Sequence, residues 1–285
     1  MPAVRLDGRP IALRIRADVK QRAEALQARG VAPKCVVMVV EGDDAGTLYA
    51  QTARRAGAEA GIQVEIVPIG AGADTSGALA IVHRIIDEPT VHGVMLQRPL
   101  PRNLDERRLV EAIDPRKDID CASPFDQGLL SLGYATIAPA TASAVLEILR
   151  EPPAKRLAGL RAVVIGRSAV VGRPVAHLLI AADATVTVCH SRTKDIAAVT
   201  RASDIIVLAV GKPRFLTGDM VRHGAVVIDV GTNVVDGRLC GDADFDSVAE
   251  VAAGVTPVPG GVGPVTTAVL LRNIVTAAES LHPAR

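Results

Sequence analysis

The turn between Gly166 and Pro174 has the residue types and the position to bind a phosphate group. It follows a short apolar run and leads into a segment with helical periodicity. Small residues let a backbone approach a pyrophosphate closely, and the N–H groups at a helix N-terminus attract anions. Ser168 stands where the plain GxGxxG pattern has its second glycine, so an ordinary strand-to-helix turn is the alternative interpretation.

The end of the next expected strand favours NADP over NAD as the cofactor. An NAD site has an acidic residue about 20 positions after the glycine turn, whereas a 2′-phosphate needs basic and hydroxyl groups there. Residues 189–193 read Cys-His-Ser-Arg-Thr and contain no carboxylate. Ser191, Arg192 and Arg167 together could bind a phosphate dianion. A solvated strand end with an incidental arginine is the alternative.

Two further glycine-rich turns, 229–233 and 256–264, come where strands of the second half should end. The carboxyl ends of parallel strands face the ligand crevice in open α/β sheets. Glycine and proline fix the backbone and remove side chains, which suits close approach to a flat cofactor ring. A pair of purely structural turns would have the same composition.

Three polar residues of the first half are candidates for a second site. Gln97 lies at the tip of an apolar run that ends in Arg98-Pro99-Leu100-Pro101, and Asp120 belongs to the charged stretch 117–121. Tyr49, one of two tyrosines in the chain, falls on an expected helix. Each of these features on its own is more often structural. Their order along the chain is what favours a functional interpretation.

Short β-branched runs alternate with helical segments along the whole chain, which is typical of βαβ units and a parallel sheet. Expected strands of the first half are 36–41, 64–69 and 93–97, and those of the second half are 162–166, 185–189, 205–210 and 225–230. A first helix is expected from the apolar stripe Ile11, Ile15, Val19 and Ala23, with Gly30 placed to stop it. Further expected helices are 48–60, 76–87 and 265–281, with three more beginning near Pro174, Lys194 and Thr217. The sequence therefore predicts an α/β fold.

The Pro152-Pro153 break before a new strand marks a change of domain. Because the last helix arrives after the second sheet is complete, we expect it to return to the first domain. The predicted division is 1–140 plus 266–285 for one domain and 141–265 for the other.

Composition excludes several classes of protein. With 32 basic and 31 acidic residues and only 2% aromatic residues, the chain is unsuited to nucleic-acid binding. No apolar run approaches the roughly 18 residues of a membrane helix. The four cysteines, at 35, 121, 189 and 240, are too far apart for a metal knuckle or a redox CxxC pair. We expect a cytoplasmic protein without a metal.

Together these segments resemble the bifunctional methylenetetrahydrofolate dehydrogenase/methenyltetrahydrofolate cyclohydrolase (FolD) family. The resemblance covers nearly the whole chain and is strongest at 164–181, 187–193, 225–233 and 256–266. It implies a folate domain, a Rossmann-type doubly wound NADP domain, a cleft between them and a homodimer. Family members oxidise 5,10-methylenetetrahydrofolate with NADP and then hydrolyse the methenyl cation to 10-formyltetrahydrofolate.

The resemblance also implies roles for single residues. Tyr49 matches the tyrosine that stacks against the folate, Gln97 the glutamine of a VQLPLP-type segment, and Asp120 the aspartate that grips the pterin ring. These three are the candidate catalytic and substrate-binding residues. The cofactor-binding candidates are Gly166, Arg167, Ser168, Ser191, Arg192 and Thr232. Further substrate-binding candidates are Pro259, Gly260 and Gly261.

The chain departs from the family pattern at the catalytic lysine. The family's helix reads Tyr-x-x-x-Lys, which places both side chains on one face, but the fourth residue after Tyr49 is Ala53. Arg54 lies about 100° further round the helix, and a guanidinium cannot relay a proton at neutral pH. The loop 42–47 is also short, and Cys121 follows Asp120 where the family has glycine.

These departures affect the two reactions differently. Hydride transfer chiefly needs positioning, whereas hydrolysis needs an activated water and proton transfers. We therefore expect a dehydrogenase with impaired cyclohydrolase activity. The alternatives are an oxidoreductase for another one-carbon carrier or substrate, and a non-catalytic NADP- or folate-binding relative.

Overall fold

The structure, a computed structural model, describes residues 3–284 and confirms the α/β class. These residues form two compact units. We call one the six-stranded unit (residues 3–12 and Ala140–Thr266) and the other the three-stranded unit (Leu13–Pro139 and 267–284), after their main sheets. The domain boundaries given above stay a prediction, and their outer ends, residues 1 and 285, lie outside the described residues.

The six-stranded unit is built on a parallel sheet with the order β1-β11-β8-β7-β5-β6. Its strands are β1 (Val4–Arg5), β5 (Arg161–Ile165), β6 (Thr185–Cys189), β7 (Ile205–Leu208), β8 (Val226–Asp229) and β11 (Gly254–Val255). Strands β5 to β8 confirm the four strands predicted for the second half. Two-residue strands such as β1 and β11 are too short to show an alternating pattern, so the sequence does not reveal them.

Helices cover this sheet on both faces, as parallel sheets require. Helix α7 (Gly172–Ala181) packs on β5 and β6 and against α6 (Ala140–Leu149). Helices α8 (Ile196–Arg201) and α9 (Phe245–Ala249) pack on a cluster of buried side chains that includes Val163, Ile206 and Val227.

The prediction of a helix beginning near Thr217 is wrong. Only a 3₁₀ turn, η2 (Gly218–Met220), forms there. A Cβ on Gly218 would lie 2.4 Å from the carbonyl oxygen of Ser247, so this backbone is packed too closely for an ordinary helical residue. The chain then turns at Gly224, where φ is 81°, directly before β8.

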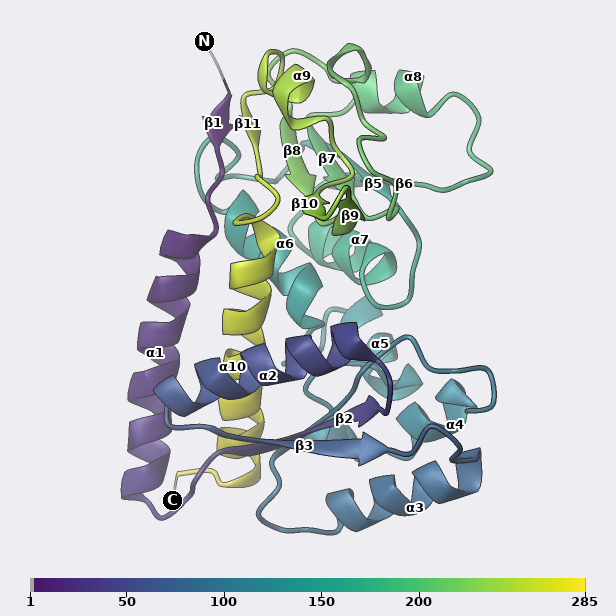
Figure 1. Cartoon of the computed structure of the whole chain (residues 1–285). Coiled ribbons are helices and arrows are strands. Elements are labelled where there is room, and N and C mark those ends of the chain that lie inside the picture. Colours follow the sequence, from purple (N-terminus) through teal and green to yellow (C-terminus); the bar gives the residue numbers. More distant parts are fainter. Residues whose placement is uncertain (1–2, 285) are drawn as a thin grey trace. The chain divides into compact units, whose positions relative to one another are not determined.

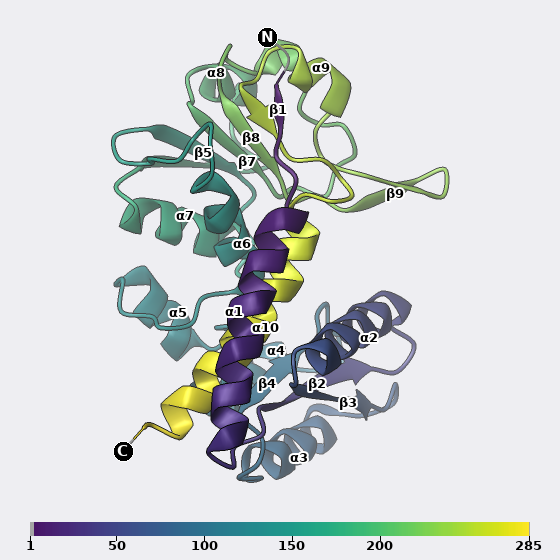
Figure 2. The ribbon, with the colours of Figure 1, turned by 90° about the vertical axis from the view of Figure 1, so that its left-hand side faces the viewer.

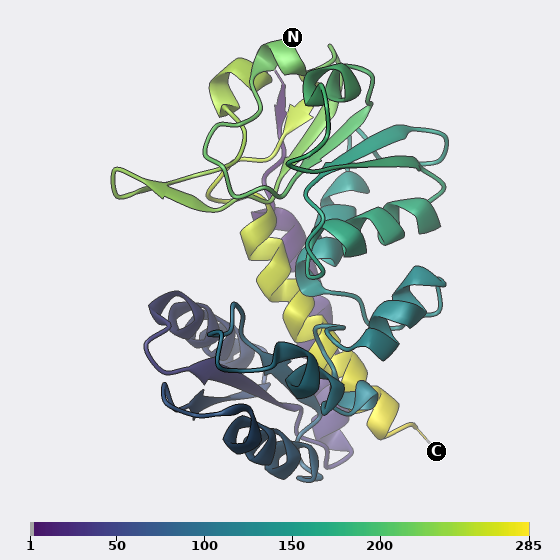
Figure 3. The same ribbon diagram turned by 90° about the vertical axis from the view of Figure 1, so that its right-hand side faces the viewer.

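A hairpin of β9 (Asn233–Val235) and β10 (Arg238–Cys240) extends from the carboxyl edge of the six-stranded sheet (Figures 2 and 3). Its turn residues Asp236 and Gly237 have φ values of 51° and 73°. Two positive φ values are typical of the type I′ turn, which Asp-Gly favours.

The three-stranded unit contains a parallel sheet with the order β3-β2-β4. Its strands are β2 (Lys34–Val40), β3 (Gln63–Ile69) and β4 (Gly93–Leu96). Helices α2 (Asp44–Glu59) and α3 (Thr75–Ile86) lie on opposite faces of this sheet (Figure 1). These elements confirm the three strands and two helices predicted here. The unit also contains α4 (Glu106–Glu111), the 3₁₀ turn η1 (Pro115–Lys117) and α5 (Pro124–Ser131).

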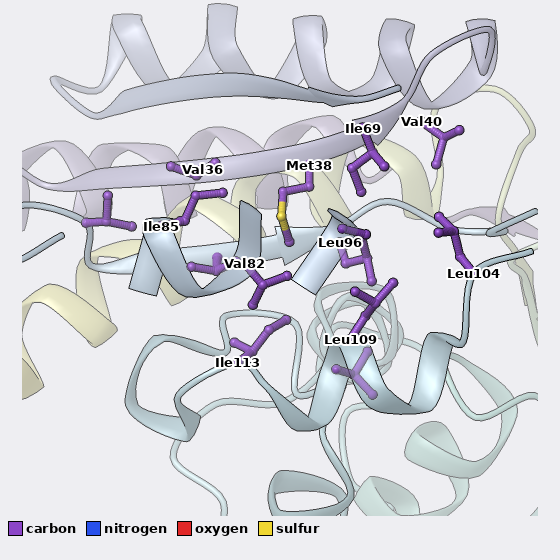
Figure 4. Packing of buried hydrophobic residues seen from close by; sticks show 14 residues of the cluster. Val36, Met38, Val40, Ile69, Val82, Ile85, Leu96, Leu104, Leu109 and Ile113 are labelled. Atoms are coloured by element: carbon purple, nitrogen blue, oxygen red, sulfur yellow. The ribbon is translucent and has the colours of Figure 1, made fainter. Parts of the chain in front are cut away.

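The core of this unit lies between β2 and the helices α3 and α4 (Figure 4). Successive strand residues point to opposite faces, and Val36, Met38 and Val40 share the face that meets Val82 of α3 and Leu109 of α4. Burying each such side chain contributes roughly 1.5–3 kcal/mol. This packing fixes the carboxyl ends of β2 and β4, where the candidate residues lie.

Two 20-residue helices, α1 (Arg9–Ala28) and α10 (Val262–Leu281), confirm the predicted first and last helices. Within the three-stranded unit they lie side by side (Figure 2), where the Arg22 guanidinium donates to the Glu279 carboxylate at 2.6 Å and to the Thr276 hydroxyl at 2.8 Å. No helix among residues 3–284 has both the length and the apolar character to cross a membrane.

Candidate active site

In each sheet the order in which strands are added reverses at one strand, β5 in the six-stranded sheet and β2 in the three-stranded sheet. The chain goes from β5 outward to β6 and then to β7 on the other side of β5; likewise it goes from β2 to β3 and then to β4 on the other side of β2. The loops after the two diverging strands leave a crevice, which is where open α/β sheets bind ligands. We therefore expect binding sites after Ile165 and Leu208 in one unit and after Val40 and Leu96 in the other.

The turn after β5 requires glycine at two positions. Gly166 has a φ of 129°, and a Cβ there would lie 2.3 Å from the carbonyl oxygen of Ala209, just beyond β7. A Cβ on Gly172, the first residue of α7, would lie 2.2 Å from the carbonyl oxygen of Gly166. The Ser168 hydroxyl accepts the N–H groups of Val171 and Gly172 at 3.2 and 3.3 Å. The turn thus brings bare backbone and the start of α7 to the crevice.

A cavity of about 350 Å³ opens beside this turn. Its lining residues include Gly166, Arg167, His190, Ser191, Lys212 and Phe215. Two cations and a hydroxyl line the cavity, and no carboxylate is among its lining residues. This chemistry fits a 2′-phosphate, since a ribose 2′-hydroxyl would be held by an acid.

Three of the six cofactor-binding candidates, Gly166, Arg167 and Ser191, meet at this cavity. Arg192 and Thr232 are exposed and do not line it. Ser168 does not line it either, and its hydroxyl accepts backbone N–H groups of α7.

Sequence analysis missed Lys212. Its ammonium lies 6.0 Å from the centre of the Phe215 ring, at the cavity. The residue follows the carboxyl end of β7, and the rule that ligands bind at such ends would have found it.

Two buried aspartates connect the loops at the carboxyl edge of the six-stranded sheet. Asp229, at the end of β8, accepts three backbone N–H groups at 2.8–3.0 Å, two of them from residues 242–243. Asp242 accepts the N–H groups of residues 210–212 at 2.8–2.9 Å. Burial raises the pKa of Asp229 to about 6, although the hydrogen bonds oppose this shift. The network fixes the backbone at Gly231, directly before Thr232, and that of Lys212.

The substrate-binding candidates Pro259, Gly260 and Gly261 belong to the six-stranded unit and precede α10. Gly260 has a φ of 108°, and its carbonyl oxygen accepts the N–H of Gly8 at 2.9 Å. A Cβ on Gly261 would lie 2.7 Å from the carbonyl oxygen of Pro257. The turn is therefore fixed by backbone contacts, and Pro259 is the exposed side chain among residues 256–261.

In the three-stranded unit, Gln97 and Asp120 reach the same edge of the sheet. Gln97 directly follows β4, and Val94 of that strand forms a parallel bridge with Asp118. The chain from Asp118 therefore runs beside β4 in the same direction and brings Asp120 to the end of this strand. The Asp118 carboxylate holds the segment in place by accepting three backbone N–H groups of residues 120–123 at 2.8–3.3 Å.

Tyr49 approaches this pair from the second turn of α2. Burial raises the pKa of the Tyr49 hydroxyl well above its ordinary value, and the negative charge of Asp120 raises it further. The hydroxyl therefore stays protonated at neutral pH and can donate a hydrogen bond. The structure thus brings Tyr49, Gln97 and Asp120 together.

The side chain of Gln97 packs against the first turn of α2. A Cβ on Gly46 would lie 2.6 Å from Gln97 Cγ, so only glycine permits this contact. Gln97 Nε2 donates to the carbonyl oxygen of Arg98 at 3.3 Å, whereas Oε1 is buried and finds no donor among residues 3–284. A buried acceptor without a donor costs roughly 1–3 kcal/mol. A ligand N–H at Oε1 would remove this cost.

Position 53 carries no group that can transfer a proton. Ala53 lies one turn after Tyr49 on the buried face of α2 and is only 1% exposed. Arg54 is exposed and lines a different cavity, together with Lys34 and Glu65. The structure therefore gives no sign that Arg54 takes the place of a lysine.

Comparison with known proteins shows the family. Residues 6–120 match the catalytic domain of tetrahydrofolate dehydrogenase/cyclohydrolase, and residues 139–282 match the NAD(P)-binding domain of the same enzymes. The chain belongs to this family. It is 48% identical over 280 residues to the bifunctional protein FolD of Nocardia farcinica, covering 98% of this chain and 99% of the relative. It is 49% identical over 273 residues to FolD of Parafrankia, covering 96% and 98%.

Solved FolD structures have the same fold. The methylenetetrahydrofolate dehydrogenase-cyclohydrolase of Trypanosoma brucei, complexed with NADP and an inhibitor, superimposes with a TM-score of 0.94 at 38% identity and covers 100% of both chains. The bifunctional FolD enzyme of Campylobacter jejuni gives a TM-score of 0.94 at 35% identity and covers 98% of this chain and 99% of its own.

The position after Asp120 shows how the chain accommodates a departure from the family motif. Cys121 has a φ of 50°, a left-handed conformation that glycine adopts without strain and other residues adopt at a cost of about 1–2 kcal/mol. Its carbonyl oxygen accepts the Gln127 amide at 2.6 Å. The loop thus holds Cys121 in a left-handed conformation although the residue is not glycine. No group of three or more His, Cys, Asp or Glu that could hold a metal lies among residues 3–284.

Proposed function

We propose that this protein oxidises 5,10-methylenetetrahydrofolate to 5,10-methenyltetrahydrofolate with NADP, and that its hydrolysis of the product to 10-formyltetrahydrofolate is impaired. The observation that carries this proposal is the set of groups at the end of β4. Tyr49, Gln97 and Asp120 meet there, with a buried acceptor on Gln97, while the neighbouring helix position holds only the methyl group of Ala53.

The cavity of the six-stranded unit suits NADP. Arg167 and Lys212 would bind the 2′-phosphate, with Ser191 as a further donor. The pyrophosphate would lie on the glycine turn, at the N–H groups that begin α7. When bound, NADP supplies the acceptor for a hydride. The relative from Trypanosoma brucei was solved with this cofactor.

The folate-side residues would bind and orient the substrate. Asp120 can accept hydrogen bonds from N–H groups of the pterin, and Gln97 Oε1 can accept another. The Tyr49 ring can stack on the substrate while its protonated hydroxyl donates a hydrogen bond. Oxidation takes a hydride, which is the hydrogen and both electrons of one C–H bond, from the methylene carbon and leaves a cation. The protein therefore neither gives nor takes a proton in this step. Positioning alone can support such a step.

Hydrolysis of the methenyl product is different because water adds to the cation and a proton must leave. A placed acid or base contributes typically 10²–10⁴-fold to such steps. Ala53 cannot act as one. The Tyr49 hydroxyl is a poor substitute, since burial disfavours its deprotonation.

Two assays on one purified preparation test the proposal. NADPH absorbance should rise when methylenetetrahydrofolate and NADP are added. Asp120→Ala should reduce kcat/KM at least about a hundredfold, which is the loss expected when a charged contact worth about two pKa units is removed. Asp236→Asn, at the exposed hairpin tip, is the control and should leave the rate unchanged. Methenyltetrahydrofolate should then disappear little faster with the protein than without it. Absence of NADPH formation would contradict the dehydrogenase assignment.

A homodimer and a cytoplasmic location stay predictions, as does the absence of nucleic-acid and membrane partners. Sedimentation of the purified protein measures the first of these directly.

A further inference from the structure

Arg98 contributes a positive charge at the folate site that the family motif does not contain. The VQLPLP-type segment has leucine after its glutamine, whereas this chain has Arg98 after Gln97. The Arg98 guanidinium lies 3.1 Å from the Asp120 carboxylate, and a second guanidinium nitrogen lies 3.3 Å from that of Glu106. The arginine therefore bridges a site carboxylate and an exposed one.

The pair with Asp120 is better shielded than an ordinary surface ion pair. The side chains of Arg98 and Asp120 are 15% and 17% exposed, whereas that of Glu106 is 48% exposed. Partly buried charge pairs are screened little by salt, and the single charge-assisted hydrogen bond from Arg98 to Asp120 is about twice as strong as one between neutral groups. The contact with Asp120 is therefore the one able to affect the site.

We propose that Arg98 is a positioning residue of the folate site, which holds the Asp120 carboxylate in place for the substrate and supplies the fixed positive charge of a site that has no lysine. This inference builds on the proposed function, because it assumes that Asp120 binds the folate. Arg98 acts through Asp120, and its guanidinium cannot exchange protons at neutral pH. It therefore supports substrate binding for hydride transfer without restoring the proton transfer that hydrolysis needs.

The test compares Arg98→Leu with Arg98→Lys in the dehydrogenase assay. Arg98→Leu should raise KM for methylenetetrahydrofolate about 10–100-fold, the scale of a charge-assisted hydrogen bond, and leave KM for NADP within about twofold. Arg98→Lys keeps the charge and should recover most of this loss.

Two control variants separate this role from surface charge. Arg102→Leu removes an exposed arginine four residues along the same segment, and Glu106→Gln removes only the exposed partner of Arg98. Both should leave KM for the folate within about twofold of the unsubstituted protein. A matching rise in either would show a general effect of charge and would overturn the inference.

A double-mutant cycle tests whether Arg98 acts through Asp120 and is interpretable even where a single variant is less stable. Adding Arg98→Leu to Asp120→Asn should change the folate KM by less than about threefold, since the partner charge is already gone. Additive effects would overturn the inference. So would an Arg98→Leu variant with an unchanged KM for the folate in an otherwise active enzyme. A protein that forms no NADPH before any substitution would instead refute the proposed function.

Discussion

In the function that we propose, one methyl group limits the chemistry of the folate site. Ala53 has no proton to transfer, and the nearby Tyr49 keeps its own because burial raises the pKa of its hydroxyl. Hydride transfer needs neither group to ionise, whereas hydrolysis must release a proton. On this proposal the same site supports the first reaction and fails at the second.

Ala53→Lys should restore hydrolysis if only the proton relay is missing. We expect at least a tenfold rise in methenyltetrahydrofolate hydrolysis, toward the 10²–10⁴-fold typical of a placed base, with a lower Tm because the position is buried. Ala58→Lys, on the exposed side of the same helix, is the control and should give no rise. A folded Ala53→Lys protein without any gain would show that the pocket is remodelled.

Lys212→Ala should weaken NADP more than NAD. Losing a charge-assisted bond to the 2′-phosphate costs roughly 1.5–3 kcal/mol, about 10–100-fold in KM, and NAD has no such phosphate. Lys194→Ala is the matched control, because this exposed lysine does not line the cavity. The measurement is the ratio of kcat/KM values for the two cofactors, and equal losses would contradict the 2′-phosphate assignment.

At the level of residues, motif positions could be predicted and their spatial partners could not. Tyr49, Gln97 and Asp120 are recognisable from their segments, and the structure brings them together. Arg98 lies in the segment of Gln97 where the motif has leucine, and Lys212 lies in no motif. The contacts of both residues appear only when the loops fold. Whether the assigned residues act as proposed stays a prediction.

At the level of elements, the first turn of α2 couples helix capping to the folate site. Asp43 accepts the N–H of Gly46 at 2.9 Å and caps the helix, and the same glycine leaves room for Gln97. Helix stability and the position of a substrate-binding side chain therefore depend on one residue without a Cβ.

Gly46→Ala should disturb both features. The added Cβ would lie 2.2 Å from Asp43 Oδ2 and 2.6 Å from Gln97 Cγ, so we expect a loss of about 1–3 kcal/mol in stability and a higher KM for the folate. Gly128→Ala in α5 is the control, because no atom lies within 4 Å of the new methyl group. Thermal unfolding and the dehydrogenase assay measure the two effects. A Gly46→Ala protein as stable and active as the unsubstituted one would contradict this coupling.

The long elements were predictable because each buries a periodic set of apolar residues. β2, β5, β7 and β8 show as apolar runs since helices cover both faces of their sheets. The short strands β1 and β11 depend on pairing with each other and with β8, which no local pattern announces. The incorrect prediction of a helix near Thr217 has the same cause, because the contact of Gly218 with the Ser247 backbone is non-local and leaves no local pattern in the sequence.

At the level of the whole molecule, two carboxyls make folding depend on pH. Burial, opposed by a hydrogen bond from Ser123, raises the pKa of Asp126 from 3.8 to about 7, and burial raises that of Asp229 to about 6. A raised folded-state pKa means that the folded protein holds the proton more tightly than the unfolded chain. The stability gained this way is present below pH 4 and is lost as the pH rises through 7.

Asp126→Asn should remove part of this dependence, because an amide does not titrate. We expect the difference in Tm between pH 5 and pH 8 to shrink relative to that of the unsubstituted protein. Asp246→Asn replaces an exposed carboxylate and should leave the difference unchanged. An unaltered difference for Asp126→Asn would show that this carboxyl does not titrate in the folded protein near neutral pH.

The most direct test of the whole account follows the fate of the product during turnover. Methylenetetrahydrofolate and NADP are mixed with the purified protein, and NADPH, methenyltetrahydrofolate and 10-formyltetrahydrofolate are quantified together over time. We predict that methenyltetrahydrofolate accumulates in step with NADPH and that 10-formyltetrahydrofolate appears only at the rate of the uncatalysed hydrolysis. Formation of 10-formyltetrahydrofolate as fast as NADPH would contradict the account.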